Sequence, residues 1–573
     1  MSIHNAEIAG IFEHYATMLE ITDANPFRIR AYRNAARVIN ALPHSMQDLL
    51  AEGKDLTELP GIGDDLAAKI REIIATGSFA GYAALQKRLP KGLMELETVP
   101  GLGPKRIKRL YEQLGVKDLP SLVQACQTGK VAELKGFGKT SETKMLAACK
   151  LFQPGEKRCK LALAQPIASS LIAYLKRAPG VVKTAIAGSF RRCKETVGDL
   201  DIVLACKDGE KVMDHFAAYE DIVEILSKGG TRASVRLRTG LQVDLRVVPE
   251  QSYGAALLYF TGSKAHNIAL RTIAVKRGLK IIEYGVFEGS NNIGGTTEED
   301  IYRLLGLPYI EPELRENLGE IEAAYEHKLP ALITLQDIRG DLHAHTNATD
   351  GASSLEEIAR AAMARGYEYL AITDHTKQVS IAHGQDAARV LKQLKAIDAL
   401  NARLKSFKLL KSAEVDILED GSLDLPDEVL KQFDVTVCAV HSKFALSAGK
   451  QTERIIRAMD SHYFNIFAHP TGRLIGKRQG YDIDMERIMR AALERGCFLE
   501  LNATPDRLDL NDIHCRMAKE MGLKLAISSD AHHDTHLSYM EFGLNQARRG
   551  WLEASDVINT RSLTELKKLL KRH

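Results

Sequence analysis

Three aspartates in the first half of the chain have the spacing of a metal site. Asp199 and Asp201 stand at positions i and i+2 of a strand-like run, so their side chains project from the same face. Asp244 lies in a second such run, which we expect beside the first. Carboxylates with little nitrogen or sulfur suit Mg²⁺ or Mn²⁺. Two such ions can activate a primer 3′-hydroxyl and stabilise departing pyrophosphate, which predicts nucleotidyl transfer.

Residues suited to binding phosphate flank the aspartate pair. Gly188 lets the backbone approach a nucleotide, and the Ser189 hydroxyl and the Arg192 guanidinium can bind its phosphates. A lone D-x-D would more often be a solvated strand end. The combination with Gly198 and a distant third aspartate favours a catalytic site.

A second set of metal ligands follows residue 340. It combines imidazole and carboxylate groups without thiolate, which favours Zn²⁺, Mn²⁺ or Fe²⁺. Nine ligands exceed what one or two ions need, so we expect three ions, Mn²⁺ or Zn²⁺, with a metal-bound hydroxide as nucleophile. Asp374 is expected to orient a ligand. The alternative, a metal-binding scaffold without activity, is disfavoured by the complete set. The nine residues are His343, His345, Asp350, His375, Glu414, His441, His469, Asp530 and His532.

Short apolar runs are expected to position these nine residues. After Arg339, apolar strands alternate with helical stretches, which predicts βαβ units and a parallel, barrel-like sheet. Active sites in such barrels lie at the C-terminal ends of the strands, so ligands distant in sequence converge there. We expect seven strands, ending near His345, Asp374, Glu414, His441, His469, Asn502 and Asp530.

Two near-identical glycine turns interrupt the helical first 150 residues, at 59–63 and 99–103, and 135–138 is a looser third case. Glycines let the backbone approach a phosphate, and the N–H groups of the next helix supply donors. The pattern resembles the helix-hairpin-helix motif, which binds the DNA backbone without reading sequence. One such turn would often be a plain turn, but two copies favour DNA binding. The glycines concerned are Gly61, Gly63, Gly101 and Gly103.

Bulk properties narrow the class of protein. The chain of 573 residues is long enough for several domains, and its net charge of +3 does not by itself indicate nucleic acid. The eight cysteines are scattered without a C-x-x-C pair, which predicts reduced core residues of a cytoplasmic protein. No run of about 18 apolar residues occurs, so we expect no membrane span.

The first 315 residues resemble the family X DNA polymerases, the DNA polymerase beta-like nucleotidyltransferases. Besides the aspartates, the resemblance covers the segment 259–263, Tyr-Phe-Thr-Gly-Ser, which includes Gly262 and looks strand-like, together with Asn267 and Arg271. It implies that Tyr259 and Phe260 pack against the incoming sugar and that Tyr259 discriminates against ribose. It further implies that Asn267 meets the base and Arg271 the template. Arg158 falls where the family has a triphosphate-binding arginine.

The resemblance also implies a pocket for an abasic sugar near the N-terminus. Lys69 falls on the family's lyase lysine, which forms a Schiff base, and Tyr32 on a tyrosine of the same pocket. That role needs a depressed lysine pKa. A solvated helix lysine near phosphate is the simpler interpretation. Asp65 and Lys264 depart from the family, which has a lysine and an aspartate at these positions.

Residues 339–573 resemble the PHP phosphoesterase domain, so the whole chain is similar to bacterial family X DNA polymerases with a C-terminal PHP domain. We expect a gap-filling polymerase with a 3′→5′ exonuclease, with abasic-site endonuclease or 3′-phosphatase as additional activities. The expected partners are gapped or primer-template DNA and deoxynucleoside triphosphates, bound by a monomer. A PHP-type phosphatase, a non-catalytic DNA-end scaffold and an RNA nucleotidyltransferase remain as alternatives; Tyr259 disfavours the last.

The expected fold is multidomain. It comprises an α-helical helix-hairpin-helix region, an α+β nucleotidyltransferase palm and a distorted seven-stranded β/α barrel. The expected boundaries are 1–85 and 86–155 for two helical DNA-binding parts, 156–250 for the palm, 251–318 for a nucleotide- and template-binding part, 319–338 for a linker and 339–573 for the PHP domain.

Overall fold

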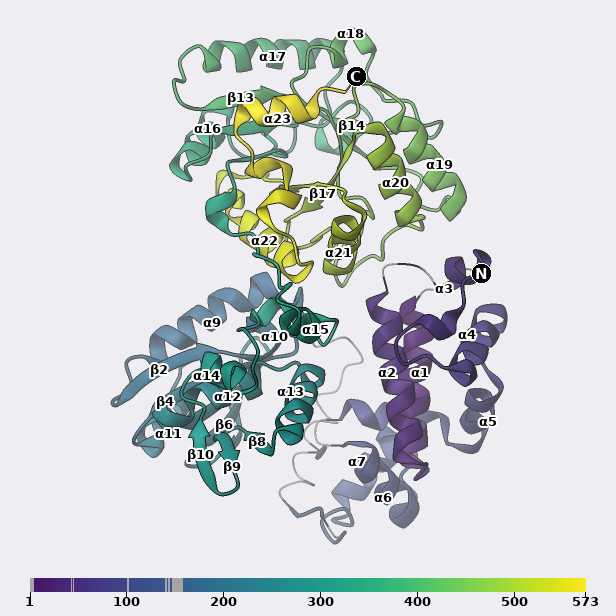
Figure 1. Ribbon diagram of the computed structural model, residues 1–573, viewed down its shortest axis with the longest axis vertical. Coiled ribbons are helices and arrows are strands. Elements are labelled where there is room, and N and C mark those ends of the chain that lie inside the picture. The colour runs from purple at the N-terminus through teal and green to yellow at the C-terminus, as the bar shows by residue number, and fades with distance from the viewer. Residues whose placement is uncertain are drawn as a thin grey trace. The chain divides into compact units, whose positions relative to one another are not determined.

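The computed structural model divides into two compact units, Met1–Glu156 and Lys157–His573 (Figure 1). Three residues of the predicted glycine turns, Pro100, Gly101 and Lys135, lie outside the described residues. No helix in the described part of the chain combines the length and apolar character that a bilayer crossing needs. The structure describes residues 5–42, 44, 46–99, 102–134, 136–139, 142, 145–146 and 158–572.

The first unit is helical, as predicted. Asn25 caps the second helix through its side chain, and Pro26 follows at the first helical position, where a missing N–H is harmless. The helices share one apolar core that includes Phe12, Tyr32 and Phe79. They are α1 (Asn5–Ile21), α2 (Pro26–Ala41), α3 (Met46–Ala51), α4 (Asp64–Thr76), α5 (Ala80–Arg88), α6 (Pro104–Leu114) and α7 (Leu119–Gln127), with the 3-10 turns η1 (Leu56–Glu58) and η2 (Lys91–Thr98).

The second unit begins with a five-stranded sheet of order β2-β4-β7-β6-β5, in which β4 and β7 are parallel. Leu200, Ile202 and Leu204 of β4 pack into one core with helices α9 (Leu161–Leu175) and α11 (Gly209–Ala217). Because side chains alternate along a strand, the aspartates of β4 project from the opposite face. The strands are β2 (Val181–Ile186), β4 (Asp199–Cys206), β5 (Ile222–Lys228), β6 (Arg232–Leu237) and β7 (Gln242–Val248), and β1 (Cys159–Lys160) pairs separately with β3 (Thr196–Val197).

A smaller lobe follows the sheet. Its run around Tyr259 and Phe260, which looked strand-like, is the C-terminal end of helix α12 (Tyr253–Thr261), so that prediction was wrong. The segment expected as a linker is folded: Glu320 of α15 (Glu320–Tyr325) is buried, and its Oε1 lies 2.6 Å from Nδ1 of His266. The other elements are α13 (Lys264–Lys276), β8 (Leu279–Ile282), β9 (Gly285–Glu288), β10 (Asn291–Gly294), α14 (Glu298–Leu304), η4 (Pro312–Leu314) and η5 (Leu335–Asp337).

The third part is a parallel β/α barrel, as predicted. Two sheets, β11-β12-β13 and β14 to β18 in sequence order, meet where the third predicted strand is interrupted between Lys411 and Glu414. A parallel bridge between Ala344 and Ala531 joins the first strand to the last. The strands are β11 (Gly340–Asp341), β12 (Tyr369–Ile372), β13 (Lys408–Lys411), β14 (Glu414–Asp416), β15 (Val437–Ala439), β16 (Ile466–Phe467), β17 (Phe498–Asn502) and β18 (Leu525–Ser528).

Helices cover the barrel strands on the outside and share their main apolar core. Strands β12, β17 and β18 are buried at every residue, as expected for a parallel sheet covered by helices, whereas β13 is buried only at Leu409 and Leu410. The helices are α16 (Leu355–Ala364), α17 (Ala387–Asn401), α18 (Asp427–Leu430), α19 (Ala448–Met459), α20 (Met485–Arg495), α21 (Asp512–Met521), α22 (Met540–Arg549) and α23 (Leu563–Leu570), with the 3-10 turns η6 (Ser380–Ala382), η7 (Asp534–Tyr539), η8 (Ala554–Asp556) and η9 (Ile558–Thr560).

Candidate metal centres and DNA contacts

The three palm aspartates lie side by side on two parallel strands. Asp201 of β4 is the direct register partner of Asp244 of β7, and Asp199 lies two residues before Asp201 on the same face. Asp244 accepts hydrogen bonds from Ser234 Oγ and from Gln242 Nε2, the latter at 2.9 Å. The sheet therefore brings together the three carboxylates that the sequence indicated.

The electrostatics of this group fit a divalent cation. Burial, together with the carboxylates of Asp199 and Asp244, raises the pKa of Asp201 to about 7. Burial and Asp244 also raise the pKa of Asp199. Arg192 opposes both shifts only in part. Carboxylates packed this closely repel one another when ionised, and a bound cation removes that cost.

This repulsion predicts a pH-dependent stability of the metal-free protein. The raised pKa of Asp201 means that stability present at pH 4 is lost as the pH rises through 7, by at most about 4 kcal/mol at about 1.36 kcal/mol per unit. Thermal unfolding in EDTA at pH 5 and pH 8 measures the loss, and Asp201→Asn, which carries no charge, should show less of it. An equal pH response of both proteins would contradict the prediction.

The phosphate-binding candidates surround the aspartates. Gly188 has φ +62°, and the Asp201 carboxylate occupies the space that a Cβ there would need, so only glycine fits. Ser189 lies on the short helix α10 (Gly188–Arg191). Arg192 donates from Nε to Glu316 Oε1 at 3.0 Å and from Nη1 to the carbonyl oxygen of Thr261. The bonds of Arg192 hold its guanidinium near Asp199 and Asp201, where its charge partly opposes the rise in their pKa.

Arg158 and Gly198 lie on the other side of Asp199. Arg158 donates to Thr196 from Nε to Oγ1 at 2.9 Å and from Nη2 to the carbonyl oxygen at 2.7 Å. It is among the charges that lower the pKa of Asp199. A Cβ on Gly198 would lie 3.4 Å from Arg158 Nη1, so the two predicted residues are neighbours.

The residues expected at the sugar, base and template lie at the junction of α12 and α13. The rings of Tyr259 and Phe260 meet edge to face, with centroids 5.0 Å apart, and the Arg271 guanidinium lies 5.1 Å from the Tyr259 ring. Asn267 Nδ2 donates to the Tyr259 carbonyl oxygen at 2.7 Å. Gly262, with φ +68°, caps α12 directly beside Arg192. The structure brings this series together at one edge of the aspartate site.

The glycine turns precede helices whose first N–H groups have no side-chain cap. Gly63 is the N-cap of α4 and Gly103 that of α6, and neither helix has a side-chain cap bond. Gly61 has φ +77°, a conformation that favours glycine, and a Cβ on any of these three glycines would meet nothing within 4 Å. A phosphate could approach the backbone at these glycines and accept hydrogen bonds from the first N–H groups of the following helix.

The proposed lyase lysine is held in its charged form. Lys69 forms an ion pair with Asp65 and lies 5.7 Å from the Tyr32 ring. Burial opposes the charge, but bonds to Asp65 and Tyr32 outweigh it and raise the pKa of Lys69. Schiff-base chemistry needs the neutral amine. Asp65, where the beta-type enzymes have lysine, therefore works against the lyase role.

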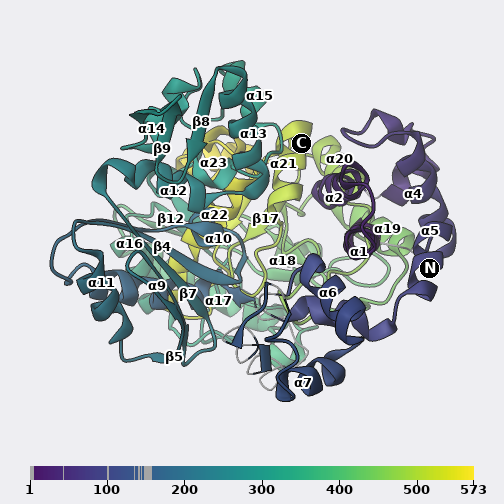
Figure 2. The same cartoon turned by 90° about the horizontal axis from the view of Figure 1, so that it is seen from below.

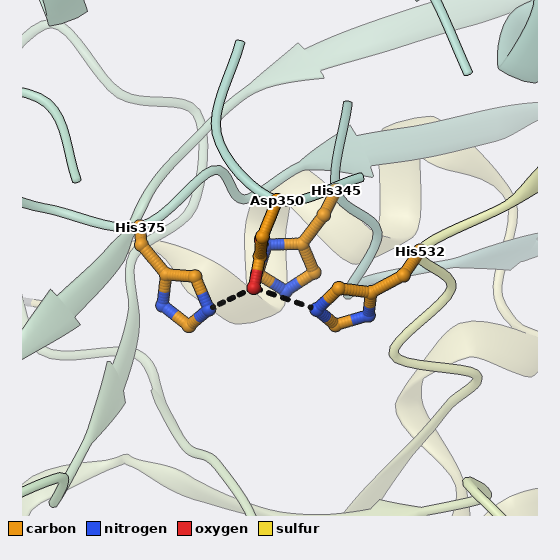
Figure 3. A group of neighbouring side chains, drawn as sticks. All are labelled: His345, Asp350, His375 and His532. Carbon is orange, nitrogen blue, oxygen red and sulfur yellow. Dashed lines mark ion pairs between the residues drawn. The ribbon is translucent and has the colours of Figure 1, made fainter. Parts of the chain in front are cut away.

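The nine barrel residues converge at the C-terminal ends of the strands. Eight of them form three overlapping groups with ligand atoms within 4.8 Å of one another. In the first, Asp350 Oδ2 lies between His375 Nε2 at 3.5 Å and His532 Nε2 at 3.3 Å, with the His345 ring behind it (Figure 3). The groups are His345–Asp350–His375–His532, His343–His345–Asp530 and His375–Glu414–His441.

Glu414 lies at the centre of the barrel site and connects the ninth residue. Its Oε1 is 2.8 Å from His469 Nε2 and 3.2 Å from His441 Nε2. Its Oε2 is 2.9 Å from His375 Nδ1. The side chain is 1% exposed, and its distances of 3.2 Å or less to His375, His441 and His469 are those of direct contacts.

Two histidine nitrogens of the site that form no hydrogen bond fit metal ions. Nδ1 of His345 and Nδ1 of His441 are buried without a hydrogen-bond partner, and a carboxylate oxygen lies near each, Asp350 Oδ1 at 3.7 Å and Asp416 Oδ2 at 3.5 Å. Nε2 of His343 and Nε2 of His345 approach to 3.1 Å. Burial opposes protonation, yet Glu414 and Asp350 raise the pKa of His375 to about 10. The carboxylates thus favour positive charge at these nitrogens, which a divalent cation supplies.

Two residues of β17 complete the site and were missed from the sequence. Glu500 Oε1 lies 2.7 Å from His343 Nδ1, and Glu500 Oε2 accepts from the His469 backbone N–H at 2.7 Å. Asn502 Nδ2 bridges Glu500 and Asp530 at 3.1 Å each. The sequence did contain a signal for them, because Glu500 and Asn502 have i, i+2 spacing on a strand to which no ligand had been assigned.

Asp374, expected to orient a ligand, holds the loop that carries one. It accepts from the Thr346 backbone N–H at 2.9 Å and from the hydroxyl groups of Thr346 and Thr349. Asp350 follows directly on this loop. The position of the Asp350 carboxylate therefore depends on Asp374.

Glu500→Gln is expected to weaken metal binding in the barrel about 10- to 100-fold, because a carboxylate on Nδ1 fixes the tautomer of His343 and raises its basicity. Exonuclease activity titrated against Mn²⁺ measures the shift, with primer extension unchanged. Glu494→Gln, an exposed position on α20, is the matched control. An unchanged Mn²⁺ midpoint would rule out this role.

Five family models match the chain. They are a helix-hairpin-helix domain at 3–79, a SAM-like helix-hairpin-helix tandem at 93–150, the DNA polymerase beta palm at 164–258, the DNA polymerase beta thumb at 256–316 and a PHP domain at 341–504.

Three relatives are similar to parts or to the whole of this chain. DNA polymerase lambda of Rattus norvegicus is 26% identical over 49% of this chain and 52% of its own, and a probable phosphatase of Thermoanaerobacter sp. (strain X514) is 30% identical over 40% of this chain and 94% of its own. The "DNA polymerase/3'-5' exonuclease PolX" of Bacillus subtilis (strain 168) is 40% identical over the full length of both chains. This chain belongs to the bacterial family X DNA polymerases that carry a C-terminal PHP domain.

Proposed function

We propose that the palm aspartates extend a primer across short DNA gaps during repair and that the barrel site removes nucleotides from 3′ ends. The observation that carries this is the presence of both complete sets in one chain that is similar over its full length to a polymerase/3′–5′ exonuclease. The two activities complement each other, because a polymerase needs a clean 3′-hydroxyl and an exonuclease can produce one.

At the palm, Asp199, Asp201 and Asp244 would hold Mg²⁺ or Mn²⁺. Such ions, when bound, activate the attacking hydroxyl and neutralise charge on the phosphates. Arg192 and Arg158 would bind the triphosphate, since both guanidinium groups lie close enough to lower the pKa of Asp199. The remaining contacts are those proposed from the sequence: Ser189 and the Gly188 and Gly198 backbone to phosphate, Tyr259, Phe260 and Gly262 beside the sugar, Asn267 to the base and Arg271 to the template.

In the barrel, the nine residues would hold three ions, Mn²⁺ or Zn²⁺, that supply a nucleophile and bind the phosphate. Three overlapping groups support that number. Asp350, His441 and His532 are the partly exposed members of the set, so a DNA end would approach the ions on their side. Abasic-site endonuclease and 3′-phosphatase activities would use the same ligands.

The proposed partners are gapped DNA and deoxynucleoside triphosphates, bound by a monomer in the cytoplasm. Seven described cysteines are free, which suits a reducing compartment. We keep the domain limits proposed from the sequence, 1–85, 86–155, 156–250, 251–318, 319–338 and 339–573.

A 5′-labelled primer on a gapped template tests the proposal. With Mn²⁺ alone the primer should shorten, and with nucleotides it should extend across the gap. A primer left unchanged in both reactions would favour a non-catalytic scaffold. Turnover of para-nitrophenyl phosphate without action on labelled DNA would favour a phosphatase, and equal use of ribonucleotides would favour an RNA transferase.

A further inference from the structure

A buried arginine of the barrel reaches the phosphate-binding segment of the palm. Arg549, the last residue of α22, has a side chain that is 4% exposed. Its Nη1 donates to the carbonyl oxygen of Arg192 at 2.8 Å. Figure 1 shows α22 at the lower end of the barrel, above α10, which ends directly before Arg192, and in Figure 2, seen from below, the two helices overlap. The contact therefore joins the barrel to the nucleotide site itself.

One carboxylate oxygen links the two arginines. Glu316 Oε1 accepts from Arg192 Nε at 3.0 Å and from Arg549 Nη1 at 3.2 Å. Burial opposes its ionisation, but Lys194, Arg549 and Arg192 lower the pKa of Glu316. Glu316 is thus a charged bridge between Nε of Arg192 and Nη1 of Arg549.

A carboxylate of the barrel binds the Arg549 guanidinium. Asp512 Oδ2, at the start of α21, accepts from Nε at 2.9 Å and from Nη2 at 2.6 Å. All three guanidinium nitrogens of Arg549 are therefore engaged, two by Asp512 and one by the Arg192 carbonyl and Glu316. The planar Arg549 guanidinium is bonded on two edges and has little rotational freedom. Its position therefore helps to fix the positions of the groups that it binds.

Arg192 is consequently held at three points. The carbonyl oxygen is fixed by Arg549, Nε by Glu316 and Nη1 by the Thr261 carbonyl oxygen. None of these bonds uses Nη2, the outer nitrogen. A second barrel residue contacts the palm three residues after Arg192: Arg473 Nη2 donates to Glu195 Oε2 at 2.7 Å.

We propose that Arg549 is a positioning residue of the polymerase site: it holds Arg192 in the orientation that binds the incoming nucleoside triphosphate, so that the PHP barrel contributes to nucleotide binding. This rests on the proposed role of Arg192 as a phosphate ligand. It goes beyond that role by making a residue of the hydrolytic domain part of the machinery for synthesis.

Arg549→Lys tests the proposal with the least risk to folding, because it keeps a positive charge next to Asp512 and Glu316. One ammonium cannot reproduce a fork bound at both ends. The KM for the nucleotide should rise roughly tenfold, the scale of a charged hydrogen bond, with kcat at saturating nucleotide and the KM for DNA retained. Arg549→Ala, with its 3′→5′ exonuclease activity as the measure of folding, should show a larger rise.

Two comparisons separate positioning from general damage. Arg548→Lys alters the neighbouring arginine, which bonds Glu313 Oε1 at 2.7 Å and the Ile333 carbonyl oxygen at 3.1 Å, and should leave the KM for the nucleotide unchanged. In Arg192→Ala, where the proposed phosphate ligand is gone, adding Arg549→Lys should cause no further rise, because the second residue acts through the first.

Different failures have different meanings. A raised KM in Arg192→Ala with a KM within twofold of wild type in Arg549→Lys would overturn the positioning role and leave the proposed function intact. Additive effects in the double variant would overturn it as well. An unchanged KM in Arg192→Ala would remove the phosphate role of Arg192, and this inference with it.

Discussion

Asp201→Asn should lower the rate of primer extension by about 10²- to 10³-fold, the scale of losing one strong electrostatic contact to a transition state. Asp201 is the register partner of Asp244 and shares a strand face with Asp199, so its carboxylate would contact any metal ion held by the three aspartates. Asparagine keeps the shape but removes that charge. Single-turnover extension of a 5′-labelled primer in saturating Mg²⁺ measures the effect.

Degradation of the same primer should proceed at the wild-type rate in Asp201→Asn, because the barrel ligands are untouched. Asp214→Asn is the matched control: this palm carboxylate is 74% exposed and pairs with Lys228 on the surface. Extension by Asp201→Asn at more than a tenth of the wild-type rate would show that the aspartate set is not the polymerase site.

Glu414→Gln should have the opposite effect: a loss of exonuclease activity by about 10²- to 10³-fold, with extension retained. The carboxylate lies within 3.6 Å of nitrogens on five histidines, so its replacement by an amide removes the negative charge that these histidines share. Metal content by plasma mass spectrometry should fall together with the activity. The five are His343, His345, His375, His441 and His469.

Glu419→Gln controls for Glu414→Gln. Glu419 lies shortly after the same strand, is 58% exposed and pairs with Lys443, so its loss should change neither activity. Full exonuclease activity in Glu414→Gln, or loss of extension in a folded Glu414→Gln protein, would be incompatible with two independent sites.

Local patterns predicted much of this molecule. Alternation along β4 placed Asp199 and Asp201 on one face, and apolar runs located each barrel strand, because strand period and burial are properties of a few neighbouring residues. Convergence of the nine barrel residues followed from topology alone, since parallel strands end on one side.

Features that depend on distant packing could not be predicted in this way. The segment at Tyr259 and Phe260 is apolar on all sides, which a buried strand and a buried helix share, and its helical state is decided by the lobe around it. Glu500 acts on His343 across the barrel, and Arg549 on Arg192 across a domain junction. No short window of sequence contains such pairs.

The proposed metal ligands of the barrel are shared between groups, and this has a consequence for how the site would bind metal ions. His345 belongs to the groups of Asp350 and Asp530, and His375 belongs to those of Asp350 and Glu414. Each of the three groups therefore shares at least one residue with another group. Binding of an ion at one position would orient imidazoles for the next, and removal of one ion would disturb its neighbours. We expect the cage to load and empty cooperatively, so that partial chelation yields a mixture of full and empty molecules.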